Sequence, residues 1–420
     1  MTEFAVDGPK RALLEAIDRD REAIIKFVSE FVRCRTPNPP GVTTEAADFV
    51  RSFLEQEGLA CREIAPQADR PNFVATLDLG PGDKHLVLNG HIDVFPVEDE
   101  ARWTVDPWGG EVRDGRINGR GAADMKCGTA ASIWTYRYLS GVAEQLCGRL
   151  TLTVVSEEEN FGPDGMRHLM DRYTDDVLGT CCLNGEPSSP HTVRFGEKAP
   201  LWLKFFVKTR GGHGAFVHTS DNAGLVALDI ISELRQIPEM PFQEPAALAA
   251  VLDQSSEAID RAYGDGASRV IRQPSFNLGT IRAGVKVNMI AAECEFEADF
   301  RIPNGITSGD VLQRVDAIME RFPQAQYEVL NRNEPNWCEP DHEMIRHVQE
   351  NAALLGREPP ARVISPGATD ARLWRLRGVP AVVYGPTPNG MGSADEYVEI
   401  DELMHVVKCH VLSAFDYLRR

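Results

Sequence analysis

An acidic run follows a short apolar segment in the first half of the chain. Glu157, Glu158 and Glu159 come directly after an apolar stretch at residues 150–155 that predicts a strand. Because three carboxylates beside a buried strand repel one another, such a run is costly unless a cation compensates the charge. A solvated acidic turn is the alternative interpretation.

Imidazole and carboxylate side chains follow other apolar segments. His91 and Asp93 come after a predicted strand, Glu186 follows another apolar stretch, and Asp124 ends a glycine-rich turn before a helix of small residues. An imidazole with several carboxylates can hold a divalent cation, and Asp93 could fix the tautomer of His91. A lone His-x-Asp is more often structural, so the hypothesis depends on these residues lying together.

Helices and strands alternate around these residues. Helical spacing predicts helices at 13–32, at 44–56 with Thr43 or Thr44 as the cap, and at 343–355. Apolar runs predict strands at 72–79, 85–88, 150–155 and 379–384. This alternation predicts an α/β fold with a mostly parallel sheet, whose strands bind ligands beyond their carboxyl ends.

The middle of the chain has a different pattern. From about residue 194, strands at 201–207 and 294–301 accompany a helix at 222–234, and the second strand alternates apolar and polar residues. A period of two indicates a sheet with one solvated face. Because 420 residues exceed the size of a single core, we predict two domains. These are residues 1–193 plus 333–420, and an inserted α+β domain at 194–332.

Composition and charge exclude several classes of protein. A net charge of -19, from 44 basic and 63 acidic residues, would repel nucleic acid. No apolar stretch is long enough for a membrane helix, and the first residues do not form a secretory signal, so we expect a cytoplasmic protein. The nine cysteines lack Cys-x-x-Cys spacing, which argues against disulfides and a thiolate zinc site.

Taken in order, these residues resemble a known metallohydrolase family. The family includes acetylornithine deacetylase, succinyl-diaminopimelate desuccinylase, aminoacylase and carboxypeptidase G, and the resemblance covers nearly the whole chain. Besides the acidic residues it includes residues 103–126, Gly212-His213, 299–301, 367–372 and 395–397. The resemblance implies that the inserted domain is a lid that also forms a homodimer or higher homo-oligomer.

The resemblance implies a role for each residue of the candidate centre. His91 and Glu186 hold one metal, Asp124 bridges, and Glu159 belongs to the second metal. Glu158 is the general base that takes a proton from metal-activated water. Asp93 is expected to take part in catalysis by orienting the imidazole of His91.

Further residues are assigned to the substrate. His213 of the lid reaches a partner subunit's active site and stabilises the developing oxyanion, and His218 is the competing candidate. Arg301 binds a substrate carboxylate through a planar two-point contact, while Asn288 and Thr369 contribute neutral hydrogen bonds. A surface charge for Arg301 and a turn residue for Asn288 are the alternatives.

The sequence departs from the family at two positions. Glu157 stands where the family usually has aspartate. Gly392 stands where the family has a histidine that completes the second metal site, and Asn389, Ser393 or Asp395 could replace it. We therefore expect one tight site for Zn²⁺ or Mn²⁺, with Co²⁺ as a further candidate, and a second cation that is weak or absent.

Amide hydrolysis of an N-acyl amino acid, or of a similar small molecule with a carboxylate, is the leading functional hypothesis. The missing histidine favours an alternative, the hydrolytic deamination of an aromatic amino acid, as in the family's nitroanthranilic acid aminohydrolase. A non-catalytic binding relative is a third hypothesis. Retention of His91, Asp124 and Glu158 argues against it, because binding alone needs no general base.

Overall fold

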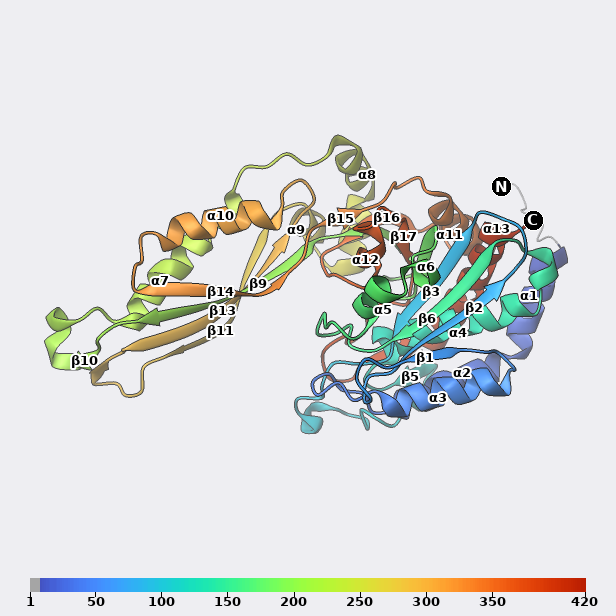
Figure 1. Ribbon diagram of the computed structural model, residues 1–420, viewed down its shortest axis with the longest axis horizontal. Helices are drawn as coiled ribbons and strands as arrows, with labels where there is room; N and C mark the ends of the chain where they lie inside the picture. The colour runs from blue at the N-terminus through green and yellow to red at the C-terminus, as the bar shows by residue number, and fades with distance from the viewer. Residues whose placement is uncertain (1–7) are drawn as a thin grey trace. The chain divides into compact units, whose positions relative to one another are not determined.

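The chain divides into two compact units in a computed structural model that describes residues 8–420 (Figure 1). Unit 1 comprises residues up to 195, 338–363 and 369–420, and unit 2 comprises 196–337 and 364–368. Unit 1 contains all of the acidic residues singled out above. The role of unit 2 as a lid and dimerisation domain stays a prediction.

The largest sheet has nine strands and positions the candidate site. Its order is β1-β2-β6-β3-β7-β17-β8-β15, and β16 also pairs with β8. The central strands β6, β3, β7 and β17 run parallel, whereas the flanking pairs are antiparallel. This arrangement confirms the predicted α/β class. The bounds are β1 (Arg62–Ile64), β2 (Asn72–Asp78), β3 (His85–His91), β6 (Arg149–Val155), β7 (Cys181–Asn184), β8 (Thr192–Glu197), β15 (Asn336–Trp337), β16 (Ala361–Ser365) and β17 (Ala381–Val383).

Helices cover both faces of the central strands. Val87 of β3 belongs to an apolar cluster with Met166 and Leu169 of α5 (Met166–Arg172). Gly90, which points to the opposite face, lies against α4 (Cys127–Ser140), where a Cβ atom would be 2.5 Å from Thr129 Oγ1. The other helices of unit 1 are α1 (Gly8–Arg19), α2 (Arg21–Arg33), α3 (Thr44–Gln56), α6 (Thr174–Val177), α11 (Glu343–Leu354), α12 (Ala371–Arg375) and α13 (Ile400–Leu418).

A small antiparallel sheet joins two distant parts of unit 1. Its order is β18-β5-β4, formed by β4 (Glu111–Arg113), β5 (Arg116–Asn118) and β18 (Tyr397–Glu399). Tyr397 pairs with Asn118. The glycine-rich turn that begins at Gly119 therefore lies beside the closing motif at residues 395–397.

Unit 2 is built on a four-stranded antiparallel sheet of order β11-β13-β9-β14. In β13, buried residues alternate with more exposed ones, which confirms the predicted one-sided sheet. Phe205 and Phe296 stack with ring centroids 4.6 Å apart in the core. The elements are β9 (Ala199–Lys208), β10 (Gly212–His213), β11 (Ser275–Ala283), β12 (Met289–Ile290), β13 (Glu293–Ile302), β14 (Ala325–Arg332), α7 (Ala223–Leu234), α8 (Ala246–Tyr263), α9 (Ala267–Ile271) and α10 (Ser308–Met319).

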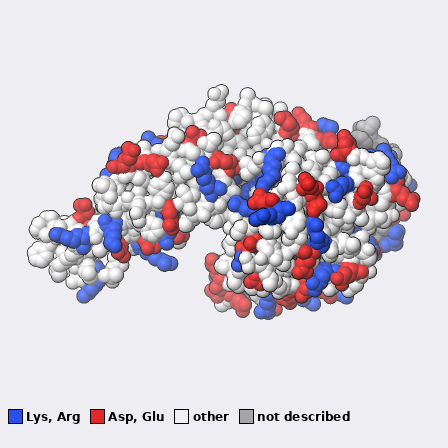
Figure 2. Space-filling view, viewed as in Figure 1, with Lys and Arg blue, Asp and Glu red and all other residues white. Residues whose placement is uncertain are grey.

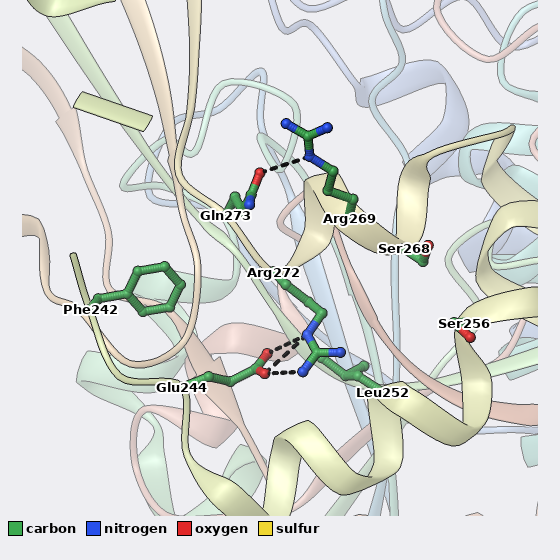
Figure 3. A pocket seen from close by; sticks show the side chains of 8 residues that line it. All are labelled: Phe242, Glu244, Leu252, Ser256, Ser268, Arg269, Arg272 and Gln273. Carbon is green, nitrogen blue, oxygen red and sulfur yellow. Dashed lines mark hydrogen bonds and ion pairs between the residues drawn. The ribbon is translucent and has the colours of Figure 1, made fainter. Parts of the chain in front are cut away.

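A cavity of about 450 Å³ lies in unit 2 beside α8 and α9 (Figure 3). Arg272 bonds both carboxylate oxygens of Glu244 and also pairs with Asp253. Arg269 donates to Gln273 at 3.2 Å. These contacts join the segment after α9 to α8 and to the segment that precedes it.

The structure corrects three local predictions. The helix predicted at 13–32 is two helices, α1 and α2, which meet at Asp20, whose carboxylate accepts hydrogen bonds from Arg137 and Tyr138. Thr43 occupies the N-cap position of α3, but its hydroxyl lies 2.7 Å from Ser156 Oγ and makes no capping bond. The strand predicted at 85–88 continues to His91 because its backbone pairs with β6 over the whole length.

All nine cysteines are free thiols in the structure. Among the helices of residues 8–420, none has the length and apolar character needed to cross a membrane. Acidic and basic side chains are interspersed on the face shown in Figure 2.

A buried histidine on α13 is bonded within the core of unit 1. His405 Nε2 lies 2.7 Å from the hydroxyl of Tyr384. Burial, together with the charges of Arg357 and Lys408, lowers the pKa of His405 to about 3. In an unfolded chain the pKa would be about 6.5. Above pH 6.5, His405 is neutral in both states and does not lower the free energy of unfolding. As the pH falls from 6.5 toward 3, the free energy of unfolding decreases, because the unfolded chain binds the proton and the folded chain does not.

We predict that His405→Gln, which cannot titrate in this range, reduces the acid sensitivity of folding. Between pH 7 and pH 5, this histidine alone should cost the wild type about 2 kcal/mol of unfolding free energy. Urea unfolding at both pH values measures the difference. Equal losses in the two proteins would show that His405 does not contribute to acid destabilisation.

Candidate metal centre

The candidate residues meet at the carboxyl ends of three adjacent parallel strands. His91 is the last residue of β3, Glu158 and Glu159 follow β6, and Glu186 lies two residues after β7. Asp124 belongs to an irregular turn, residues 122–126, that leads into α4. Because neighbouring parallel strands end at the same edge, residues far apart in the sequence come together here.

The imidazole of His91 is surrounded by carboxylates. Its Nδ1 lies 2.9 Å from the backbone oxygen of Asp93, and only 1% of the residue is exposed. Its Nε2 is buried, has no hydrogen-bond partner among the described residues, and lies 3.3 Å from Glu186 and 3.4 Å from Asp124. A bond from Nδ1–H to the carbonyl of Asp93 leaves the Nε2 lone pair for a ligand.

Like charges dominate the electrostatics of the centre. Burial and the nearby Glu186 raise the pKa of Glu158 well above its ordinary value, and burial and Asp124 do the same for Glu159. For Glu186, burial and Asp124 raise the pKa to about 7. Burial alone would lower the pKa of His91, but the carboxylates outweigh it and raise that pKa well above 6.5. Without a cation, the centre thus holds protons where a cation would neutralise the same charge.

Two overlapping sets of residues have the spacing needed to hold a cation. His91 forms one set with Asp124 and Glu159 and another with Glu158 and Glu186, and within each set the donor atoms lie within 4.8 Å of one another. Glu158 Oε1 and Glu159 Oε1 are buried without hydrogen-bond partners among the described residues. These residues fit a divalent cation. Which carboxylate is a ligand and which is the base stays a prediction, because Glu158 lies in one of the sets.

Asp93 fixes the acidic run as well as the imidazole. It is fully buried, and its two carboxylate oxygens each accept a backbone N–H, from Glu158 and from Glu159, at 3.2 Å. Asn38 donates to the same carboxylate at 2.8 Å. Although burial opposes it, the hydrogen bond and charge of His91 lower the pKa of Asp93. Sequence reasoning missed Asn38, which lies 53 residues upstream of the nearest other member (91 − 38 = 53) and has no motif of its own.

Glu157 is turned away from the centre. Its carboxylate pairs with Arg70 at 2.5 Å and accepts the backbone N–H of Asp164 at 2.8 Å. It belongs to neither of the two sets of possible metal ligands. The three glutamates are therefore distinct in their contacts, although they are adjacent and identical in the sequence.

Arg372 lies beside the predicted base. Its Nη1 is 3.6 Å from Glu158 Oε1, and its guanidinium lies 4.4 Å from the ring centroid of Phe161. Thr369, predicted to contact substrate, is buried in unit 1, where its backbone oxygen accepts from Arg372 and its hydroxyl accepts the N–H of Ala371. These contacts fix the start of α12.

Glu98 and Asp99 border the same cavity as Gly392, but among the described residues neither belongs to a set of possible metal ligands. Asp395 accepts the N–H of Thr104 at 2.7 Å and belongs to neither set of possible metal ligands. Ser393 donates to the backbone oxygen of Gly390 at 3.1 Å. Gly392 has open space where a Cβ would lie and borders a cavity of about 120 Å³ together with Arg120.

The remaining predicted residues belong to unit 2. His213, on β10, and His218, in the short 3-10 helix that follows, are exposed, and His213 Nδ1 accepts the N–H of Ala215 at 3.1 Å. Asn288 is exposed between β11 and β12. Arg301 is partly exposed at the end of β13, with its Nε 3.0 Å from a carboxylate oxygen of Asp299. Their roles toward substrate stay predictions.

A model of the peptidase family M20/M25/M40 matches residues 87–415. The chain belongs to this family. It is 29% identical over 394 residues to the succinyl-diaminopimelate desuccinylase of Rhodospirillum centenum, covering 91% of this chain and 94% of that protein. As a member of the M20/M25/M40 family, the chain is a metallohydrolase that acts on amide bonds, which confirms the resemblance.

Solved structures of the M20/M25/M40 family share the fold. A metallo-carboxypeptidase from Sulfolobus solfataricus matches with a TM-score of 0.81 at 16% identity, over 94% of this chain and 99% of that one. A dipeptidase from Saccharomyces cerevisiae matches with a TM-score of 0.78 at 14% identity, over 97% and 98%. At these identities the likeness concerns the fold alone.

We predict that His91→Asn abolishes stabilisation by divalent cations, because His91 is common to both sets of possible ligands. For the wild type, Mn²⁺ or Zn²⁺ at a hundredfold excess over the Kd should stabilise the fold by about 3 kcal/mol. Thermal unfolding with and without metal measures this. His168→Asn, a histidine of the same unit outside both sets, should keep the response. A metal-induced rise in Tm that survives in His91→Asn would place the cation elsewhere.

Proposed function

We propose that this protein hydrolyses the amide C–N bond of a small molecule that bears a carboxylate, such as an N-acyl amino acid. The observation that carries the proposal is the buried His91 Nε2, which has no hydrogen-bond partner among the described residues. It faces Asp124 of the turn and the carboxylates of Glu158 and Glu186, which follow two different strands. Such a cluster is unfavourable without a cation and suited to hydrolysis with one.

Asp124 and Glu186 belong to different sets, but both lie close to His91 Nε2, at 3.4 and 3.3 Å. We therefore assign the tight site to His91, Asp124 and Glu186, with Glu159 toward a second, weaker position. Imidazole and carboxylate ligands suit Zn²⁺ and Mn²⁺, and also Co²⁺. A divalent cation held there would lower the pKa of a water molecule and polarise a carbonyl oxygen. The absence of a side chain at Gly392 supports one tight cation per chain.

In this proposal, Glu158 moves the proton. Its Oε1 is buried and lacks a hydrogen-bond partner among residues 8–420, so it can accept a proton from water and return it to the nitrogen that leaves. Arg372, 3.6 Å away, limits where this oxygen can lie. Asp93 holds the backbone of Glu158 and thereby keeps the base beside His91.

Substrate recognition is proposed for residues of unit 2. Arg301 bonds Asp299 through Nε, and this contact does not use its two Nη groups, which could bind a substrate carboxylate in a two-point contact. His213, or His218 in its place, would stabilise the oxyanion, and Asn288 would add a neutral hydrogen bond. We also propose a homodimer formed through unit 2.

A second candidate function is the hydrolytic deamination of an aromatic amino acid. The observation that favours it is Gly392, because one metal and a carboxylate-binding arginine would suffice for attack on a ring carbon. A panel of N-acyl amino acids, dipeptides, N-succinyl diamino acids and aminobenzoates separates the two. Release of an organic acid or amino acid from an amide supports the first function, and release of ammonia from an aminobenzoate supports the second.

We predict that Glu158→Gln lowers kcat/KM by about 10²–10⁴-fold, because the amide cannot accept a proton. Its metal content should equal that of the wild type, as measured by inductively coupled plasma mass spectrometry. Glu157→Gln makes the same change one residue earlier, where the carboxylate pairs with Arg70, and should keep most of the activity. Loss of the metal in Glu158→Gln would instead identify Glu158 as a ligand, and unchanged activity would remove it from the mechanism.

A further inference from the structure

A carboxylate that belongs to neither set of possible metal ligands lies directly behind Asp124. Glu396 has no exposed surface. Its Oε1 accepts hydrogen bonds from the backbone N–H groups of Gly121, Ala123 and Asp124 at 3.0, 2.9 and 3.1 Å. Its Oε2 accepts from the guanidinium of Arg120. One side chain thus bonds four groups within five consecutive residues.

Arg120, whose guanidinium bonds Glu396, is itself held by several contacts. Arg120 is 2% exposed, and its Nη2 donates to the backbone oxygen of Ser393 at 3.0 Å. Its guanidinium lies 5.2 Å from the ring centroid of Trp103. The backbone oxygen of Glu396 accepts the N–H of Gly119 at 2.9 Å. The closing motif and the glycine-rich turn are therefore joined by main-chain and side-chain bonds.

The turn needs these bonds because its backbone is irregular. Gly121 has φ +86°, and Asp124 and Met125 have non-helical dihedral angles. Buried N–H groups in such a turn have no regular ladder or helix to bond, and each costs free energy if it stays unpaired. Charge-assisted bonds to one carboxylate satisfy three of them together. The direction of the Asp124 side chain follows from the path of this turn.

We propose that Glu396 is a positioning residue that sets the affinity of the centre for its metal, by holding the turn that presents the carboxylate of Asp124. The inference rests on the proposed metal centre. Glu396 acts through the backbone and not as a ligand, because its two oxygens are occupied by the turn and by Arg120. Partners of this kind typically change metal affinity by about 10–100-fold when they are replaced.

The test compares two glutamates of the same small region. In Glu396→Gln, an NH2 group replaces one carboxylate oxygen and cannot accept a hydrogen bond. The remaining carbonyl oxygen is uncharged, so its bonds to the turn or to Arg120 are weaker. Glu399→Gln is the matched control, because Glu399 on β18 also pairs with an arginine, Arg116 at 2.9 Å, but does not contact the turn. Metal-depleted proteins are titrated with Zn²⁺ or Mn²⁺ in competition with a chromophoric chelator, and the thermal unfolding of the metal-free proteins is recorded.

The expected result is a Kd about 10–100-fold weaker in Glu396→Gln and within about twofold of the wild type in Glu399→Gln. A folded Glu396→Gln protein with the wild-type Kd would overturn the inference and leave the proposed function intact. A wild type that binds no divalent cation would overturn the proposed metal centre itself. The two failures are therefore distinguishable.

Hydrogen exchange gives a second readout that needs neither metal nor activity, and it keeps the inference falsifiable if Glu396→Gln does not fold. In the metal-free wild type, the amides of Gly121, Ala123 and Asp124 should be protected, since each donates to Glu396. In a folded Glu396→Gln protein they should exchange faster, whereas Glu399→Gln should match the wild type. Unprotected amides in the wild type would contradict the proposal directly.

Discussion

The burial of several carboxylates around one imidazole is the constraint on which the rest of this structure depends. Removing like charges from water is expensive, and only fixed donors and a cation can offset that cost. The fold supplies the fixed donors: Asp93 binds the backbone of the acidic run, and Glu396 binds the turn at Asp124. The parallel strands bring His91 and the carboxylates together at the carboxyl ends of the sheet. Asp93 and Glu396 then keep the acidic run and the turn in place.

The sequence predicts most of the architecture because its signals are local. Helical spacing and strand alternation predict elements in both units, such as α3, α7, β6 and β13, whereas α8, α10 and α13 are not predicted. The acidic run after β6 predicts the edge of the sheet where the candidate site lies. The break at Asp20 is not visible in the spacing, because it depends on Arg137 and Tyr138 from α4. Thr43 also bonds a distant residue, Ser156, so the capping signal before α3 is misleading.

Within the candidate centre, residue types are predictable and contacts are not. The order of residues in the chain predicts the ligand candidates. The separate contacts of Glu157 and Glu158 follow from the turn after β6 and from Arg70 and Arg372. The contacts of Asn38 and Glu396 arise from segments that the fold brings together. For a site assembled from several strand ends, the order of residues in the sequence identifies the site residues. The contacts between their side chains follow only from the three-dimensional fold.

The most direct test of this account is anomalous diffraction from crystals of the wild type grown with Mn²⁺ or Zn²⁺. The account predicts one strong anomalous peak per chain, in contact with His91, Asp124 and Glu186, and a weaker peak or none toward Glu159. Two equally strong peaks would contradict the single tight site inferred from Gly392. A peak outside the group that contains His91 would contradict the metal centre as a whole.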